Sequence, residues 1–122
     1  MKPIQSLKLI RDDQIDYHLK YEDRMALYLL YDKRAHADDI LIVKNGRLTD
    51  TYYCNTAFLK KGKWYTPKHP LLKGTQREFL ISKKIIEEAD LLIGDLSQFE
   101  KIRLFNSMIQ WEDTMDVEEI YT

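Results

Sequence analysis

Apolar runs separated by turn residues give the middle of the chain a pattern typical of strands. The runs at residues 40–43, 55–59 and 64–66 are rich in β-branched and aromatic side chains. Asn45-Gly46 follows the first run and favours a two-residue hairpin turn, which predicts a return strand over residues 47–51. A Lys-Gly-Lys turn separates the other two runs, so the pattern predicts a second hairpin there.

Helical spacing appears in two segments. The first is predicted to begin after Asp16 as its N-cap and to end near Tyr31. Its apolar residues recur every four positions and form a stripe, at Tyr17, Tyr21, Met25 and Leu29. The second helix is predicted over residues 75–84, with Phe79 and Leu80 facing the core.

The two ends of the chain carry weaker patterns. Residues 2–9 mix apolar and basic side chains and predict a strand, and residues 1–14 are expected to form an N-terminal strand or linker. Towards the C-terminus, the pattern predicts a short helix capped at Asp95 and strands over 102–105 and 111–122. Hairpins interleaved with helices predict an α+β fold, a mostly antiparallel hairpin sheet with a few packed helices, in one domain that spans all 122 residues.

Composition argues against several classes of function. The chain is 44% apolar and 32% charged, and its acidic and basic residues are interspersed to a net charge of -1, so no nucleic-acid-binding face is expected. It has no apolar run long enough to cross a membrane, no signal peptide at its start and a single cysteine, Cys54, which predicts a protein of the reducing cytoplasm. The three histidines lack the spacing of metal ligands, so no metal site is expected.

Lys20 is the first of three features that carry chemistry. A lysine that forms a Schiff base must be deprotonated, which burial or a neighbouring cation promotes. Arg24 lies one helical turn from Lys20, and Tyr17 and Tyr21 could shield the amine from water. The alternative is a surface lysine on an amphipathic helix, paired with a nearby carboxylate.

Asp50 is the second feature. It follows the predicted hairpin in a β-branched context, where a carboxylate on a rigid strand can keep a pyridine nitrogen protonated. The alternative is an aspartate at a strand end that accepts a backbone N–H. Asn55 comes shortly after and either braces this site or caps backbone groups of the loop.

Gly74-Thr75, at the start of the second predicted helix, is the third feature. Backbone N–H groups at a helix N-terminus bind phosphate, glycine lets a ligand approach the backbone, and threonine adds a hydroxyl. Asn106-Ser107 ends a predicted strand and offers another hydroxyl. An ordinary N-cap and an ordinary turn are the alternatives. An amine, an acid for a ring nitrogen and a phosphate-binding helix start are together what pyridoxal 5'-phosphate requires.

With these motifs the chain resembles the C-terminal half of class IV pyridoxal-phosphate enzymes, the family of aminodeoxychorismate lyase and of branched-chain and D-amino acid aminotransferases. Lys20-x-x-x-Arg24 resembles the family's Schiff-base lysine with its following arginine, and residues 45–55 resemble the strand that carries the ring-nitrogen acid. Residues 66–77 are similar to the phosphate-binding turn and helix, and residues 105–108 to the strand end that completes the phosphate site. The family usually has glutamate where this chain has Asp50.

The resemblance implies a pyridoxal-phosphate-dependent lyase of the aminodeoxychorismate lyase type that acts on a small amino-acid-like substrate. An amino-acid aminotransferase, of the branched-chain or D-amino acid type, is the enzymatic alternative. By resemblance Lys20 is the catalytic residue and binds the cofactor, and a homodimer is expected. The remaining cofactor contacts implied by the resemblance are Asp50, Asn55, Gly74, Thr75 and Ser107.

Members of this family carry an N-terminal domain before the lysine, which closes the cleft and contributes to phosphate and substrate binding. Only residues 1–16 precede the motif here, so we expect a truncated relative or one piece of a longer or split protein. A separate chain is one source of the missing domain. A non-catalytic dimerisation or partner-binding domain derived from the family is the third alternative.

Overall fold

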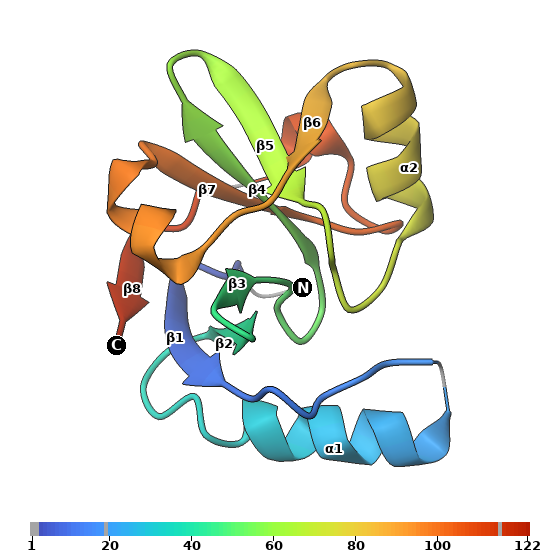
Figure 1. Cartoon of the computed structure of the whole chain (residues 1–122), viewed down its shortest axis with the longest axis vertical. Helices are drawn as coiled ribbons and strands as arrows, with labels where there is room; N and C mark the ends of the chain where they lie inside the picture. Colours follow the sequence, from blue (N-terminus) through green and yellow to red (C-terminus); the bar gives the residue numbers. More distant parts are fainter. Residues whose placement is uncertain (1–2, 19, 115) are drawn as a thin grey trace.

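Two four-stranded sheets form the framework of the protein. The computed structural model describes residues 3–18, 20–114 and 116–122. The strand orders are β3-β2-β1-β8 in the first sheet and β6-β5-β4-β7 in the second (Figure 1). The first sheet contains β1 (Ser6–Arg11), β2 (Asp39–Lys44), β3 (Arg47–Leu48) and β8 (Glu119–Tyr121). The second contains β4 (Asn55–Lys60), β5 (Lys63–Pro67), β6 (Ile86–Ala89) and β7 (Lys101–Phe105).

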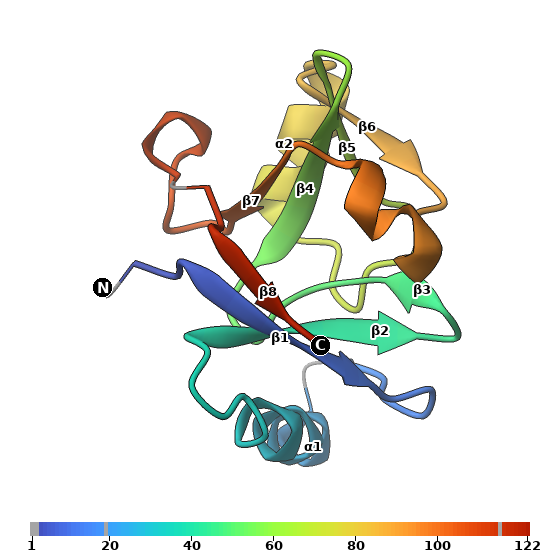
Figure 2. The ribbon, with the colours of Figure 1, turned by 90° about the vertical axis from the view of Figure 1, so that its left-hand side faces the viewer.

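The α+β class predicted from the sequence is confirmed, and the sheets are of mixed pairing. β1 lies parallel to both of its neighbours, β2 and β8, and β5 lies parallel to β6. Figure 2 shows β8 beside β1, although more than a hundred residues separate them in the chain. Turn residues reveal only hairpins, so these parallel pairs, and β6 itself, were not predicted.

Both predicted hairpins are present. Asn45 and Gly46 have φ values of 52° and 76°, and Lys61 and Gly62 have φ values of 50° and 79°. Two consecutive residues at positive φ give the type I′ geometry that fits the twist of paired strands. The return strand after the first turn is shorter than predicted, because the backbone after Leu48 leaves the regular ladder and pairs with β2 only at residues 49 and 50.

Two α-helices and two 3₁₀ helices are found in the described residues. They are α1 (Tyr21–Tyr31), α2 (Thr75–Ser82), η1 (Ile93–Gln98) and η2 (Trp111–Asp113). α1 begins five residues after the predicted cap Asp16, because the Asp23 carboxylate accepts the backbone N–H groups of His18 and Lys20 and holds that segment outside the helix. Asp95 lies inside η1 rather than at its cap, and its carboxylate accepts the N–H of Leu92.

The apolar stripe predicted on the first helix does not face the core. Tyr21, Met25 and Leu29 are 74%, 45% and 60% exposed, whereas Leu27 and Leu30 are buried against β2. In α2, Leu80 is buried as predicted but Phe79 is half-exposed. The fourfold spacing therefore predicted α1 correctly as a helix but identified its exposed side as the apolar stripe.

Strand β2 joins two hydrophobic clusters because its side chains alternate. Leu41 and Val43 point into the cluster between the two sheets, and Ile40 and Ile42 point into the cluster beneath α1. A third cluster lies between the second sheet and α2. No helix in the described ranges is long and apolar enough to cross a membrane.

Candidate functional site

A cavity of about 480 Å³ lies where α1, the loop after β3 and the start of α2 meet. The loop of residues 50–55 and residues 71–75 form adjoining parts of its wall. Residues 106–108, which follow β7, and Tyr17 and Leu27 also line it. The cavity therefore collects residues from four separate parts of the chain.

Asp50 is the buried acid of this cavity. Its backbone carbonyl accepts the N–H of Ile42 in β2, which fixes the residue to the sheet, and its Oδ2 accepts the N–H of Leu72 at 3.0 Å. Its Oδ1 is buried and has no hydrogen-bond partner among the residues that the structure describes. Burial raises the pKa of Asp50 to about 7, although the Leu72 N–H and the Asn55 side chain pull it down. A buried carboxylate oxygen without a donor is costly, and Asp50 is one of the residues that line the cavity.

Asn55 and Asp50 both form hydrogen bonds with the backbone of Leu72. Its Nδ2 donates to the carbonyl of Leu72 at 2.8 Å, while Asp50 accepts the N–H of the same residue. The two side chains thus fasten the loop before α2 to the loop before β4. This bond to a loop carbonyl is compatible with both predicted roles of Asn55, bracing the site and capping backbone groups of the loop.

Gly74 is needed at its position because of Asn55. A Cβ on Gly74 would lie 2.6 Å from the Asn55 Oδ1, although the backbone of Gly74 itself is in the ordinary extended region. Side-chain volume, rather than an unusual φ, therefore excludes other residues here. Gly74 is also the N-cap of α2, and Thr75 is its first residue.

We expect Gly74→Ala to destabilise the protein by about 1–3 kcal/mol, the usual range for overpacking a tight site. Gly94→Ala is the matched control, because nothing lies within 4 Å of its added Cβ and its φ is not positive. Urea denaturation measures both. In the double variant Gly74→Ala/Asn55→Ala the penalty for the alanine at 74 should shrink, and strictly additive effects of the two changes would contradict the proposed clash.

Arg77 holds the start of α2 in place from within the core. Its side chain is 1% exposed, and its Nη2 donates to Glu88 Oε2 at 2.6 Å and to the Pro67 carbonyl at 3.1 Å. Its Nη1 contacts Glu78 at 3.2 Å. These partners on β5 and β6 give Arg77 a structural role.

Asn106 and Ser107 form the remaining wall. The Asn106 Oδ1 accepts the N–H groups of Met108 and Ile109 at 2.8 and 2.9 Å, which makes this segment a tight turn. Ser107 lines the cavity beside that turn. Asp50, Asn55, Gly74, Thr75 and Ser107, five of the six predicted site residues, therefore surround one space.

Lys20 is the predicted site residue that the structure does not bring to the cavity wall. It is exposed at the N-cap of α1, and it is absent from the lining, which includes Tyr17 and Leu27 on either side of it in sequence. A different amine, Lys73, lies on the wall between Leu72 and Gly74. Lys73 lies within the predicted phosphate-binding segment, residues 66–77, but at a variable position to which the sequence analysis gave no role.

Cys54 and Asp39 were not predicted to matter and lie close to the same loop. Burial raises the pKa of the Cys54 thiol to about 12, so it stays protonated and is a poor nucleophile. Asp39 is fully buried, and its Oδ1 accepts the N–H of Tyr52 at 3.0 Å, which ties the middle of the loop to β2. The sequence signal that could have identified Asp39 is its position as a charged residue at the start of an apolar strand.

Comparison with known proteins gives consistent matches. The sequence model of the family "Amino-transferase class IV" matches residues 18–112. An uncharacterised protein of Haemophilus influenzae is 43% identical over 96 residues, which cover 79% of this chain and 51% of that protein. The crystal structure named a "putative 4-amino-4-deoxychorismate lyase" from Haemophilus somnus 129pt is 39% identical with a TM-score of 0.82, covering 88% of this chain and 56% of that one.

A more distant structure shares the fold. The branched-chain amino acid aminotransferase from Escherichia coli has a TM-score of 0.76 at 13% identity, and the match covers 96% of this chain and 44% of that one. The chain thus spans about half the length of the relatives it matches.

Proposed function

Because the chain belongs to the class IV aminotransferase family, we propose that it forms the cofactor-binding part of a pyridoxal-phosphate-dependent lyase of the aminodeoxychorismate lyase type. The family membership rests on a match to more than half of the chain. The lyase assignment is supported by the name of the Haemophilus somnus relative. An amino-acid aminotransferase is the second candidate, supported by the fold shared with the Escherichia coli enzyme.

The unpaired Oδ1 of Asp50 is the observation that carries the proposal. A protonated pyridine nitrogen is a donor of the kind this buried acceptor lacks. A positive ring beside Asp50 would also favour its charged form, offsetting the effect of burial on its pKa. Bound pyridoxal phosphate supplies an aldehyde and an electron-withdrawing ring, and Asp50 would hold the proton on its ring nitrogen.

The part of the wall formed by the start of α2 suits the phosphate. The N-terminus of α2 carries backbone N–H groups that have no side-chain cap, and Gly74 and Thr75 place them at the cavity. The hydroxyls of Thr75 and Ser107 add donors. Asn55 keeps this wall at a constant position relative to Asp50, because it binds the loop that leads into α2.

The test of cofactor binding is spectroscopic. Titration of the purified chain with pyridoxal 5'-phosphate should produce a visible absorption band that saturates, and Asp50→Ala should weaken or abolish it. Absence of saturable binding in the unaltered chain would remove the proposed function. Lyase and aminotransferase activities are then separated by assaying 4-amino-4-deoxychorismate against a branched-chain amino acid with a keto acid acceptor.

On the basis of the Lys20-x-x-x-Arg24 motif, we propose Lys20 as the amine that binds the cofactor and as the general base, although it does not line the cavity in this structure. Borohydride reduction of the cofactor complex, followed by peptide mapping, should place the label on Lys20, and Lys20→Ala should remove it. Lys73→Ala is the control, because Lys73 lines the cavity without belonging to the motif. A label on Lys73, or one spread over many lysines, would refute the assignment to Lys20.

A second protein surface covers the mouth of the cavity in the proposed enzyme. The cavity-lining residues Tyr53, Leu72 and Met108 expose large apolar areas, and the exposed stripe on α1 adds Tyr21 and Met25. The covering surface belongs to a further domain, a separate chain or a second copy in a homodimer. A non-catalytic partner-binding domain would use the same surface. Sedimentation analysis with and without the cofactor distinguishes self-association from a need for another chain.

A further inference from the structure

A second cavity, of about 500 Å³, lies on the other side of Tyr53 from the candidate cofactor site. Its walls come from the C-terminal end of α1, the turn that follows it and the segment before β1. Arg34, His36 and Asp38 provide the charged or ionisable side chains, and Ile4 and Ala37 provide apolar surface. Tyr53 lines both cavities, so the two share one aromatic side chain.

Arg34 presents a guanidinium that no carboxylate satisfies within the described part of the chain. Its Cζ lies 4.0 Å from the centre of the Tyr31 ring, and its Nη1 donates to the Tyr31 carbonyl at 3.3 Å. Arg103 offers a contrast, because it also stacks on aromatic rings but pairs with Asp116 at 3.4 Å. Arg34 is held by its stacking while most of its donors stay available, which is the arrangement suited to a planar anion.

The aromatic wall beside Arg34 is pre-arranged. Tyr31 stacks on Tyr52 with ring centres 4.5 Å apart, and Tyr53 meets both rings edge-on, at 5.7 and 4.6 Å. Tyr53 is half-exposed, so its ring can contact a ligand. Next to Arg34, Ala35 has a φ of 55°, a conformation that costs an alanine free energy and is most often retained where the local shape has a use.

The other charged groups limit the ligand. The Asp38 carboxylate also lies at this cavity, and its Oδ2 accepts the N–H groups of Gln5 and Ser6 at 2.9 and 3.3 Å. Asp38 is therefore engaged with the start of β1, and the Arg34 guanidinium is the group that would meet an anionic ligand. One guanidinium fork, one aromatic face and an apolar floor match a flat acid with a single negative charge.

We propose that the cavity between Arg34 and Tyr53 binds a small aromatic or cyclic monocarboxylate, with the carboxylate on the Arg34 guanidinium and the ring against Tyr53. This site goes beyond the proposed cofactor chemistry, and its occupancy does not require the cofactor. Because Tyr53 lines both cavities, a ligand bound there would lie next to the candidate cofactor site.

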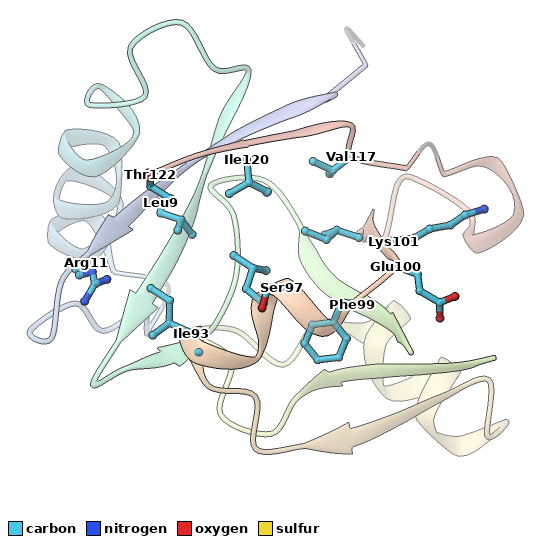
Figure 3. A pocket seen from close by; sticks show the side chains of 13 residues that line it. Leu9, Arg11, Ile93, Ser97, Phe99, Glu100, Lys101, Val117, Ile120 and Thr122 are labelled. Carbon is cyan, nitrogen blue, oxygen red and sulfur yellow. The ribbon is translucent and has the colours of Figure 1, made fainter. Parts of the chain in front are cut away.

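Another cavity, of about 590 Å³, is the competing location and provides the control (Figure 3). It lies between β1, η1, β7 and β8, and aliphatic side chains such as Leu9, Ile93 and Ile120 surround it. Arg11 is the arginine of that cavity and the counterpart to Arg34, but Phe99 lies well away from Arg11 in Figure 3.

The test uses benzoate as the probe and the cofactor-free chain as the protein. Amide chemical shifts followed by two-dimensional NMR should move at residues 34–37 and at Tyr53, and neutral benzamide should bind at least about tenfold more weakly, because it lacks the charge that Arg34 meets. Arg34→Gln should weaken benzoate binding by a similar factor. Arg11→Gln, the matched control, should leave it unchanged.

Three results would overturn the proposal. They are equal affinity for benzoate and benzamide in the unaltered protein, unchanged benzoate affinity in Arg34→Gln, and shifts confined to η1 and β8, which would place the ligand in the cavity of Figure 3. The first comparison needs no variant, so the test survives a failure of Arg34→Gln to fold. Failure of cofactor binding would leave these results unaffected, which separates the two proposals.

Discussion

Replacement of Arg77 by alanine is expected to destabilise the protein by about 3–5 kcal/mol, near the upper end for a single substitution. Arg77 is the largest side chain among the fully buried residues, so alanine leaves a large cavity beneath α2. The Pro67 carbonyl loses its charged donor, and Glu88 loses the partner that lies 2.6 Å away. Each of these losses lowers the free energy of unfolding.

Arg77→Met separates packing from charge. Methionine restores much of the volume but donates no hydrogen bond, and the Glu88 carboxylate that loses its partner is 40% exposed, so water can hydrate it. We expect a loss of about 1–2 kcal/mol, which is roughly the cost of leaving the Pro67 carbonyl unpaired. Arg24→Ala, at an exposed position of α1, is the control and should change stability by less than about 0.5 kcal/mol. Urea denaturation monitored by tryptophan fluorescence measures all three.

Loss of the Arg77 side chain should also displace the start of α2, which lines the candidate site. Its side chain ties the first turn of α2 to β5 and β6, and the N-terminus of α2 forms the proposed phosphate wall. A cost below about 1 kcal/mol for Arg77→Ala would show that the packing of Leu80 alone positions this helix.

Local signals explain which parts of the fold could be predicted. Asn45-Gly46 and Gly62 encode their turns in the residues themselves, so both hairpins were found. The parallel neighbours of β1 depend on residues 39–44 and 119–121, and no short-range pattern connects them to residues 6–11. Long-range pairing is set by burial of the two sheet faces, which a single sequence does not display.

Some residues of the two cavities could likewise be predicted from the sequence, and others could not. Asp50, Asn55 and Gly74 were chosen as motif positions, and the structure joins all three around the backbone of Leu72 and the Asn55 side chain. Arg34 and Tyr53 come together only because the turn after α1 meets the loop after β3. Neither residue stands out in the sequence, since a lone arginine and a lone tyrosine are ordinary at an exposed loop.

The pH dependence of stability is the second large effect that we expect. Asp50 has a pKa of about 7 in the folded protein and 3.8 as its ordinary value, so between these pH values the folded state binds one proton more than the unfolded state. Stability must therefore fall as pH rises from about 4 to about 7. Asp39 adds a fall of the same sign that ends earlier, because burial raises its pKa to about 6.

Asp50→Asn should remove the Asp50 part of this slope. The amide keeps the shape of the side chain and an oxygen for the Leu72 N–H, but it carries no charge that ionises on raising the pH. At about pH 8 the variant should be more stable than the unaltered protein by about 1–3 kcal/mol, less than the full pKa difference implies because charged groups relax and attract water. At about pH 4 the two proteins should be nearly equal.

The interval between about pH 7 and 8 identifies the residue responsible. Asp39 is mostly ionised at pH 7, whereas Asp50 is only half ionised there, so the unaltered protein and Asp39→Asn should both still lose stability in this interval and Asp50→Asn should not. Urea denaturation at half-unit pH steps resolves the three curves. A slope that persists in this interval in Asp50→Asn would show that Asp50 ionises at a lower pH. The Oδ1 of Asp50 would then be stabilised as an anion without any ligand, and the strongest reason for placing a ring-nitrogen proton beside it would be lost.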